Sequence, residues 1–465
     1  MSKIKVSILC PSDGRARVHE SLESTIRNHA QKLLEALTDT GEVEAEVAPE
    51  IITGEKIAKE MGVWANTRNA DAILFSMPIF AFPNLTAIAA RIIQQPVAVI
   101  APCIPELPAL GGMQAAVNMI RQNGGQCEKF YGSYDNEHID ALMNFLRACK
   151  AKTRLMGQVY GLIGGRSIGM GSGVAPSDRW MQQFGIDVEH IDQLELVRRT
   201  DLVPQSDTLY AVEWLEKHLR NVEYDGGKLT RENLMRQAAF YIATRSIVQE
   251  RGLDFIGIKC HYELSEYDVT QCLSAMLLGE NEDWNGPKTP VPCACEADSD
   301  AALTMQVLGL ITGLPVLFLD FRYMSRDGLL SLCNCGAMTC WYSRGGTLLE
   351  NLSQVKAVPV IPKYGGGGAH FSYMAKPSKM TFARFTHTPD TYKITVFKGE
   401  TVNMPEEKMN ETAPQWPHAF VRPSPDFDEL LARYDSNHVH AVQGDCVEAL
   451  RSFCILTGVE FDFVE

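Results

Sequence analysis

The sequence lacks any long hydrophobic run. No window holds about 18 consecutive apolar residues, so we expect no transmembrane helix and no membrane partner. Basic residues are also scarce, with 43 lysines and arginines against 57 aspartates and glutamates and a net charge of −14. Because so acidic a protein repels phosphate backbones, we do not expect nucleic acid as a partner. The first residues, MSKIKVSILCPSDGR, are too polar for a signal peptide.

The cysteines do not form the pattern of a disulfide framework. There are 13 of them, an odd number, spread from Cys10 to Cys454. An oxidising compartment would disfavour so many unpaired thiols, and we therefore expect a cytoplasmic protein. With 465 residues and a hydrophobic fraction of 45%, the chain can form hydrophobic cores without disulfides.

Short β-branched runs alternate with helical patterns over most of the chain. KIKVSILC, VEAEVAPE, DAILFSMP and PVAVIAP predict strands, with helices over 18–38 and in NLTAIAARIIQQ. A second such unit starts near Gln158, with strands in QVYGLIGG, FIGIKC, PVPCAC and PVLFLD and helices over 231–249 and 265–278. This alternation predicts doubly wound parallel sheets, in which ligands gather at the carboxyl ends of the strands.

The pattern changes beyond about Gly345. KMTFARFTHT and TYKITVFKG alternate in the way of antiparallel strands with exposed polar faces, and HVHAVQ, a helix from about Cys446 and VEFDFVE follow. The sequence thus predicts an α/β protein with two doubly wound parallel-sheet domains, followed by a C-terminal domain with antiparallel, barrel-like β structure. The expected domains are 1–153, 154–318 and 319–465.

Two acids flank a predicted strand–helix–strand unit in PVPCACEADSDAALTMQVLGLITGLPVLFLDFRYMS. Glu296 follows the first strand, Asp298 or Ser299 can cap the helix, and Asp320 ends the second strand. A crossover of this length makes the strands parallel and near neighbours, about 4.8 Å apart. We therefore expect the two carboxylates to reach one cation. The alternative is that Glu296 is a loop acid and Asp320 caps the following turn, with no shared function.

Two other patterns suggest cofactors but fit them poorly. In the Gly-rich turn GGRSIGMGSG the glycines from Gly169 to Gly173 recur at every second residue, whereas a dinucleotide fingerprint needs G-x-G-x-x-G. We interpret this segment as a turn between domains. Cys293, Cys295, Cys333 and Cys335 form two C-x-C pairs, which suit small buried side chains in strands better than a thiolate zinc site. The role of these cysteines stays open.

The segment CEADSDAALTMQVLGLITGLPVLFLDFR resembles the metal-site region of the L-fucose isomerase family. SDGRARVHESLE, GGRSIGMGSG with VEHIDQLELVRR, WPHAFVRP and SNHVHAVQGD resemble further family segments in the same order. The likeness covers nearly the whole chain except the middle of the first domain. It implies an aldose–ketose isomerase that acts through an enediol and uses Mn2+ or another divalent cation.

The resemblance also implies the site residues. The metal ligands would be Glu296, Asp320 and His438, and the two acids would also be the catalytic acid/base pair. His440 would point to the same face of a strand as His438, and its role stays open. A ligating histidine usually binds a carboxylate or carbonyl through its other nitrogen, and Asp445 is one possible partner.

Further side chains are expected to bind the substrate: Arg15, Lys259, His261, Trp416 and Asn437. Lys259 and His261 follow the strand FIGIKC, and Trp416 could stack on a sugar face. For Arg15, the resemblance implies a role at a neighbouring subunit's active site, in a homohexamer with sites at subunit contacts. The substrate stays open between L-fucose or D-arabinose and a sugar with a different C6 group, including a charged one. The alternatives are an NAD-dependent oxidoreductase of a small polyol and a non-catalytic sugar-binding protein.

Overall fold

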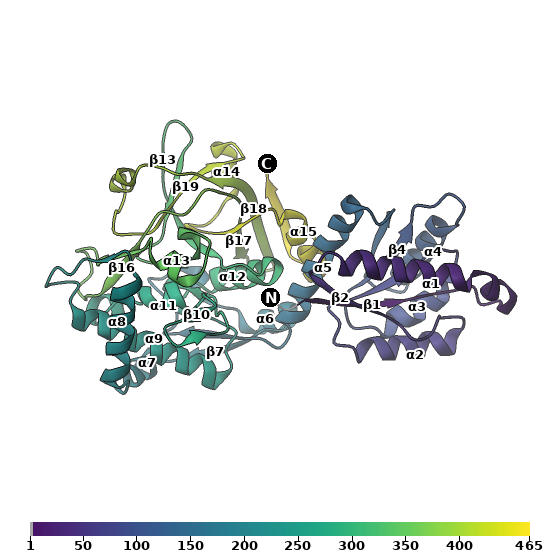
Figure 1. The fold of residues 1–465 in the computed structure, drawn as a ribbon, viewed down its shortest axis with the longest axis horizontal. Coiled ribbons are helices and arrows are strands. Elements are labelled where there is room, and N and C mark those ends of the chain that lie inside the picture. Colours follow the sequence, from purple (N-terminus) through teal and green to yellow (C-terminus); the bar gives the residue numbers. More distant parts are fainter. Residues whose placement is uncertain (1–2) are drawn as a thin grey trace. The chain divides into compact units, whose positions relative to one another are not determined.

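The computed structural model describes residues 3–465. The chain forms two compact units (Figure 1). The first comprises Met1–Arg154 and Glu448–Thr457, and the second comprises Leu155–Val447 and Gly458–Glu465. Within the described residues, no helix combines the length and apolar character that a bilayer span requires.

The first unit is a parallel sheet covered by helices on both faces. Its strand order is β2-β1-β3-β4-β5, and all its pairings are parallel, which confirms the doubly wound prediction. Its elements are β1 (Ile4–Leu9), α1 (Ala16–Thr38), β2 (Val43–Val47), α2 (Glu55–Asn66), β3 (Ala72–Ser76), α3 (Pro83–Ile92), β4 (Val97–Pro102), α4 (Ala109–Gln122), β5 (Glu128–Gly132) and α5 (Asn136–Leu155). Strands β3 and β4 are buried along their whole length, because one core packs under α1 and α5 and another under α2, α3 and α4.

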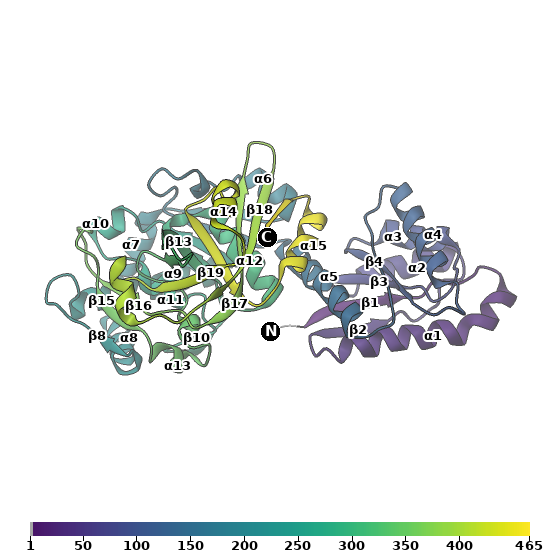
Figure 2. The same cartoon turned by 90° about the horizontal axis from the view of Figure 1, so that it is seen from above.

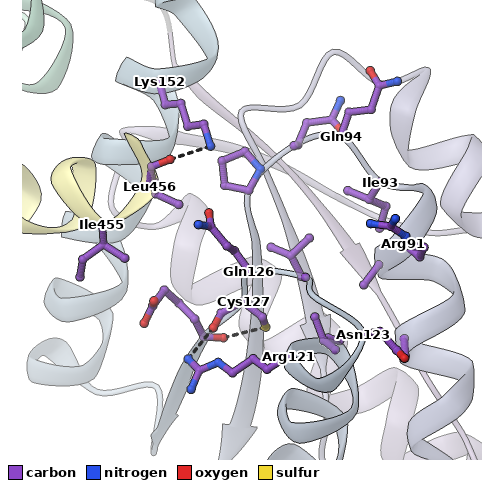
Figure 3. A pocket seen from close by; sticks show the side chains of 18 residues that line it. Arg91, Ile93, Gln94, Arg121, Asn123, Gln126, Cys127, Lys152, Ile455 and Leu456 are labelled. Atoms are coloured by element: carbon purple, nitrogen blue, oxygen red, sulfur yellow. Dashed lines mark hydrogen bonds between the residues drawn. The ribbon is translucent and has the colours of Figure 1, made fainter. Parts of the chain in front are cut away.

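A helix from the far end of the chain completes this unit. Helix α15 (Val447–Thr457), yellow in Figure 1, contributes Leu456 to the core beneath α1 and α5. The ammonium of Lys152 on α5 donates to the Leu456 carbonyl at 2.9 Å. Both residues line a cavity of about 450 Å³ beside the amino ends of β4 and β5, where Arg121 also points (Figure 3).

The second unit contains a four-stranded parallel sheet, in the order β12-β9-β6-β7. The elements of this part are β6 (Val159–Ile163), α6 (Ser177–Phe184), β7 (Asp187–Ile191), α7 (Gln193–Asp201), α8 (Gln205–His218), α9 (Arg231–Arg251), β9 (Phe255–Ile258), β12 (Cys293–Ala294) and α12 (Ser299–Thr312). The Gly-rich segment joins β6 to α6 inside this unit. Our interpretation of it as a turn between domains is therefore wrong.

The predicted helix over 265–278 is also wrong, because it is broken into two short helices. These are α10 (Glu263–Tyr267) and α11 (Cys272–Leu277). Between them, Asp268 leaves the helical conformation with φ −140° and ψ −120°, and its carboxylate binds Arg236. Val269 then forms a β-bridge with Gly367. Tertiary partners therefore override the helical pattern of the sequence.

The rest of the second unit is built around a closed antiparallel barrel (Figure 2). Its strands follow the order β17-β20-β13-β14-β19-β18, and β18 pairs again with β17. The strands are β13 (Leu317–Met324), β14 (Leu330–Cys333), β17 (Ser378–His387), β18 (Tyr392–Thr401), β19 (His418–Pro423) and β20 (His438–Gln443), and β21 (Glu460–Val464) adds parallel to β18. The expected barrel-like antiparallel structure is thereby confirmed.

The exposed polar faces that we expected for the two long strands are not present. Six consecutive residues of β17, Met380–Phe385, are buried. Closure of the barrel covers one face of β17, and α12 covers the other, where the Thr304 hydroxyl accepts from the Phe385 backbone N–H at 3.0 Å. Small elements complete the unit: β8 (Asn221–Val222), β10 (Glu282–Asp283), β11 (Gly286–Pro287), α13 (Leu348–Leu352), β15 (Lys356–Pro359), β16 (Ala369–Ser372) and α14 (Phe427–Arg433).

Candidate functional site

Glu296, Asp320 and His438 lie next to one another in the second unit. Glu296 follows β12 in a short turn before α12, Asp320 lies in β13, and His438 is the first residue of β20. Strands β13 and β20 are antiparallel neighbours, with Asp320 directly opposite His438. The Nε2 atom of His438 is 3.3 Å from Asp320 Oδ1 and 3.6 Å from Glu296 Oε2. One imidazole nitrogen therefore faces two carboxylates.

The route by which the two acids meet differs from our expectation. Strand β12 belongs to the parallel sheet and β13 to the barrel, so the two strands are not parallel neighbours. Helix α12 links two sheets, because the residues after it pair with β20 and β14 and not with β12. Asp320 also lies in the middle of its strand and not at the end. The carboxylates meet where the end of the parallel sheet adjoins the barrel.

The backbone at Glu296 adopts an uncommon conformation. Glu296 and Ala297 have φ values of 57° and 52°, in the left-handed region that side chains other than glycine rarely occupy. Such conformations persist where surrounding packing holds them, often at functional sites. Here Gly257 of β9 packs so closely that an added Cβ would lie 3.1 Å from Ala297 Cα. The turn directs the Glu296 side chain towards His438.

Asp298 holds the imidazole of His438 in place. Its Oδ2 atom lies 2.6 Å from His438 Nδ1, so Nε2 is left to face the two acids. Asp298 also caps α12 by accepting from the Ala301 N–H at 3.0 Å, and Arg384 Nη2 lies 2.9 Å from its Oδ2. Our prediction that Asp445 could be the partner of His438 is wrong, because the Asp445 carboxylate pairs with Lys398 instead. A carboxylate behind an imidazole is the usual arrangement for orienting a histidine ligand.

Burial and neighbouring charges set the ionisation of these groups. Burial raises the pKa of Glu296, and the nearby Asp320 charge adds to the increase, although His438 opposes it. Burial alone would raise the pKa of Asp298, but Arg384 and His438 outweigh it and hold that pKa below its usual value. For His438, burial is outweighed by hydrogen bonds to Asp298 and Asp320, which raise its pKa to about 9. These hydrogen bonds therefore favour the protonated form of the imidazole.

The donor set suits a hard divalent cation. Among residues 3–465, no three His, Cys, Asp or Glu side chains are already placed as a metal site would require. However, two carboxylates with one imidazole are the ligands that manganese and similar ions prefer. The separations of 3.3 and 3.6 Å are also close to the distance of about 3 Å between adjacent donors around an octahedral ion with bonds of about 2.1 Å. The three residues fit such an ion after small carboxylate rotations and loss of the imidazole proton.

The expected substrate-binding residues have different surroundings. Lys259 forms an ion pair with Glu263 at 2.6 Å, and His261 Nδ1 lies 2.9 Å from the Ser265 hydroxyl. Both follow β9, the strand that pairs with β12 just before Glu296. Trp416 is buried against Cys333 and Ala413. The Asn437 carbonyl accepts from the Phe321 N–H at 3.0 Å, and its side chain is exposed.

Arg15 lies in the first unit, directly before α1. Its side chain is 68% exposed and binds Asp13 through Nε at 2.9 Å and Nη2 at 2.6 Å. The ion pair lowers the pKa of Asp13. The Arg15 guanidinium is thus held in a fixed direction at the surface of this unit.

Sequence reasoning missed three residues around the acids. Asp298 was predicted only as a helix cap, and Arg384 was assigned to an exposed strand although its side chain is 2% exposed. Cys335 lies with its sulfur 3.5 Å from Glu296 Oε1 and 3.9 Å from the Cys295 sulfur. The sequence did show the two C-x-C pairs. However, the spacing within a pair does not reveal that Cys295 of the first pair contacts Cys335 of the second.

Comparison with known families gives two matches at the two ends of the chain. The model of the first N-terminal domain of L-fucose isomerase matches residues 3–157, and the model of the L-fucose isomerase C-terminal domain matches residues 332–465. Together they cover more than half of the chain, including Arg15 and His438.

Several curated proteins are similar to this chain. A sulfoquinovose isomerase from Alkalicoccus urumqiensis is 23% identical over 65% of this chain and 64% of its own length. An L-fucose isomerase from Klebsiella pneumoniae subsp. pneumoniae is 25% identical over 48% of this chain and 44% of its own length. The chain therefore spans less than two thirds of each of these relatives. An L-fucose isomerase from Haemophilus influenzae is 22% identical over 95% of this chain and 89% of its own length.

Proposed function

The chain belongs to the L-fucose isomerase family, and we propose that it interconverts an aldose and a ketose with the aid of a divalent cation such as Mn2+. The observation that carries this proposal is the position of His438 Nε2, within 3.6 Å of both Glu296 and Asp320 and fixed from behind by Asp298. Relatives named for L-fucose and for sulfoquinovose support a sugar substrate.

The reaction requires a proton to leave C2 and return to C1, with a second proton moving between O2 and O1. When bound, the cation supplies Lewis-acid polarisation of the carbonyl and stabilises the negative charge of the enediolate. Glu296 and Asp320 are the acid/base pair as well as ligands, with His438 as a ligand only. Burial raises the pKa of Glu296, which favours uptake of a proton by this carboxylate.

Solvent deuterium tests the proton-transfer route. We expect that turnover of an aldose panel in deuterium oxide with Mn2+ places deuterium at C1 or C2 of the product, because the acid/base group exchanges its proton with solvent. Proton NMR of the product measures the label. Samples with excess chelator control for uncatalysed exchange. Complete turnover without any label would indicate a hydride shift and would remove the acid/base roles of Glu296 and Asp320.

We also propose that the protein assembles as a homohexamer in which Arg15 of one subunit serves the site of a neighbour. The local support is the exposed guanidinium, which Asp13 holds in a fixed direction. If the site is shared, mixing inactive Arg15→Ala subunits with inactive Glu296→Gln subunits should restore activity, because some sites then draw intact halves from two chains. Activity of the mixture against each variant alone measures this.

The control is Arg17→Ala, a neighbouring exposed arginine, which we expect to stay active without mixing. Labelled subunits of the two variants must be shown to exchange between oligomers, because only mixed oligomers can contain restored sites. Exchange without recovered activity, or an active monomer by light scattering, would contradict the shared site.

A further inference from the structure

Two basic side chains gather at Trp416 without an acidic partner. The Arg322 guanidinium carbon is 5.2 Å from the centroid of the Trp416 ring, and the Lys363 ammonium is 5.8 Å from it. Lys363 is also 5.2 Å from the centroid of the Tyr364 ring. Among residues 3–465, neither cation forms an ion pair or hydrogen bond with another side chain, although acids outnumber basic residues by 57 to 43. Aromatic faces attract and orient such cations but do not neutralise them.

This cationic cluster, defined as Arg322, Lys363 and Trp416, adjoins the proposed active site. Trp416 packs in one cluster with Cys333 and Cys335, and the Cys335 sulfur lies 3.5 Å from Glu296 Oε1. Arg322 follows Asp320 by two residues on β13, at the irregularity where the pairing with β14 shifts between Phe321 and Tyr323, and its guanidinium lies over the Trp416 ring. The cations therefore stand beside the carboxylates but do not pair with them.

A third hydrogen-bond donor lies within the cluster. Trp416 is 5% exposed, and its indole Nε1 has no hydrogen-bond partner among the described residues. Buried donors in native proteins almost always have a partner, so an unpaired one beside two free cations indicates that an acceptor is supplied from outside the chain. A guanidinium, an ammonium and an indole N–H together favour an anion with several oxygens.

We propose that the sugar substrate carries an anionic group, a phosphate, sulfonate or carboxylate, at the end of its carbon chain away from C1 and C2. Arg322, Lys363 and the Trp416 N–H bind this group, while C1 and C2 lie at Glu296 and Asp320. The opposite orientation would place C1 and C2 away from Glu296 and Asp320, the proposed acid/base pair. This inference rests on the proposed isomerase function for its assignment of the C1 end.

The test compares aldoses that differ only in their terminal group: hydroxymethyl, phosphate, sulfonate or carboxylate. We expect kcat/KM to be at least about tenfold higher for one anionic aldose than for the neutral aldose, since one charge-assisted hydrogen bond accounts for about that factor. The anion with the highest value identifies the chemical source. Arg322→Met and Lys363→Met should each lower the ratio of anionic to neutral kcat/KM by about tenfold. Arg326→Met, in the same hairpin, is the matched control and should change this ratio less than about twofold.

A binding experiment separates this inference from the isomerase proposal. Calorimetry would compare an unreactive open-chain polyol bearing a terminal sulfonate or phosphate with the same polyol without it. Tighter binding of the charged polyol, lost in Arg322→Met, supports the anion site even if no aldose is converted, in which case only the isomerase proposal fails. Equal binding of the two polyols, or equal kcat/KM for neutral and anionic aldoses, would overturn the anion site. Arg322 and Lys363 are exposed, so their substitution should leave the fold intact.

Discussion

Replacing Glu296 by glutamine is expected to lower kcat by at least about a thousandfold and to weaken Mn2+ binding, with the fold preserved. The substitution keeps the size of the side chain but removes the charge that faces His438 and an acid/base group. Asp320→Asn and His438→Ala should have effects of the same size, because each removes one of three protein ligands. Turnover at saturating sugar, together with metal content after gel filtration, measures both losses.

The matched control for these variants is Asp445→Asn. Asp445 lies only seven residues after His438, but its carboxylate pairs with Lys398 at 3.4 Å in an exposed position. This variant should keep its metal and its turnover. If Glu296→Gln retained full activity, Glu296 would be neither a ligand nor the base, and the proposed mechanism would lose its central group.

Arg384→Met is expected to lower the free energy of unfolding by about 3–5 kcal/mol. Asp298 and Arg384 are 0% and 2% exposed, and their ion pair of 2.9 Å lies behind the site. Removing the Arg384 guanidinium leaves the Asp298 carboxylate buried with only His438 as a charged partner. The main cost is the desolvation of the Asp298 charge, which Arg384 no longer compensates. Urea unfolding followed by tryptophan fluorescence would measure the change.

A surface ion pair provides the comparison for this effect. Arg422 and Asp327 are 55% and 65% exposed and lie 3.4 Å apart, so Arg422→Met should cost less than about 1 kcal/mol. The double variant Arg384→Met with Asp298→Asn should recover part of the lost stability, because it no longer buries a charge. If Arg384→Met and Arg422→Met had equal effects, burial would not govern the strength of the Asp298 pair.

Hydrophobic periodicity predicted most strands and helices, because each element buries one face at a fixed spacing. It could not predict what covers the other face. The alternating pattern of β17 is that of a half-exposed strand, yet closure of the barrel and α12 bury Arg384 there. A single sequence likewise shows that a helix connects β12 and β13, but not that the second strand pairs with β20 in a different sheet.

The sequence predicted which residues form the candidate site better than it predicted how the fold brings them together. Resemblance placed Glu296, Asp320 and His438 together, and the structure brings their side chains within 3.6 Å of the imidazole. The partner of His438 could not be found by proximity in sequence, since Asp298 precedes it by 140 residues. Arg322 and Lys363 were missed because an exposed basic residue has no pattern that distinguishes a ligand-binding role from simple solvation.

The position of α15 bears on how the protein is made. A ribosome releases β1 to α5 early, but Leu456, which packs against their core, follows only after almost all of the second unit has been translated. Ala449, Leu450 and Phe453 of the same helix are fully buried in the finished protein. Until they emerge, the nascent first unit leaves an apolar surface uncovered, which makes it a target for chaperones. A premature stop codon before Glu448 would thus damage the portion of the protein that was synthesised first.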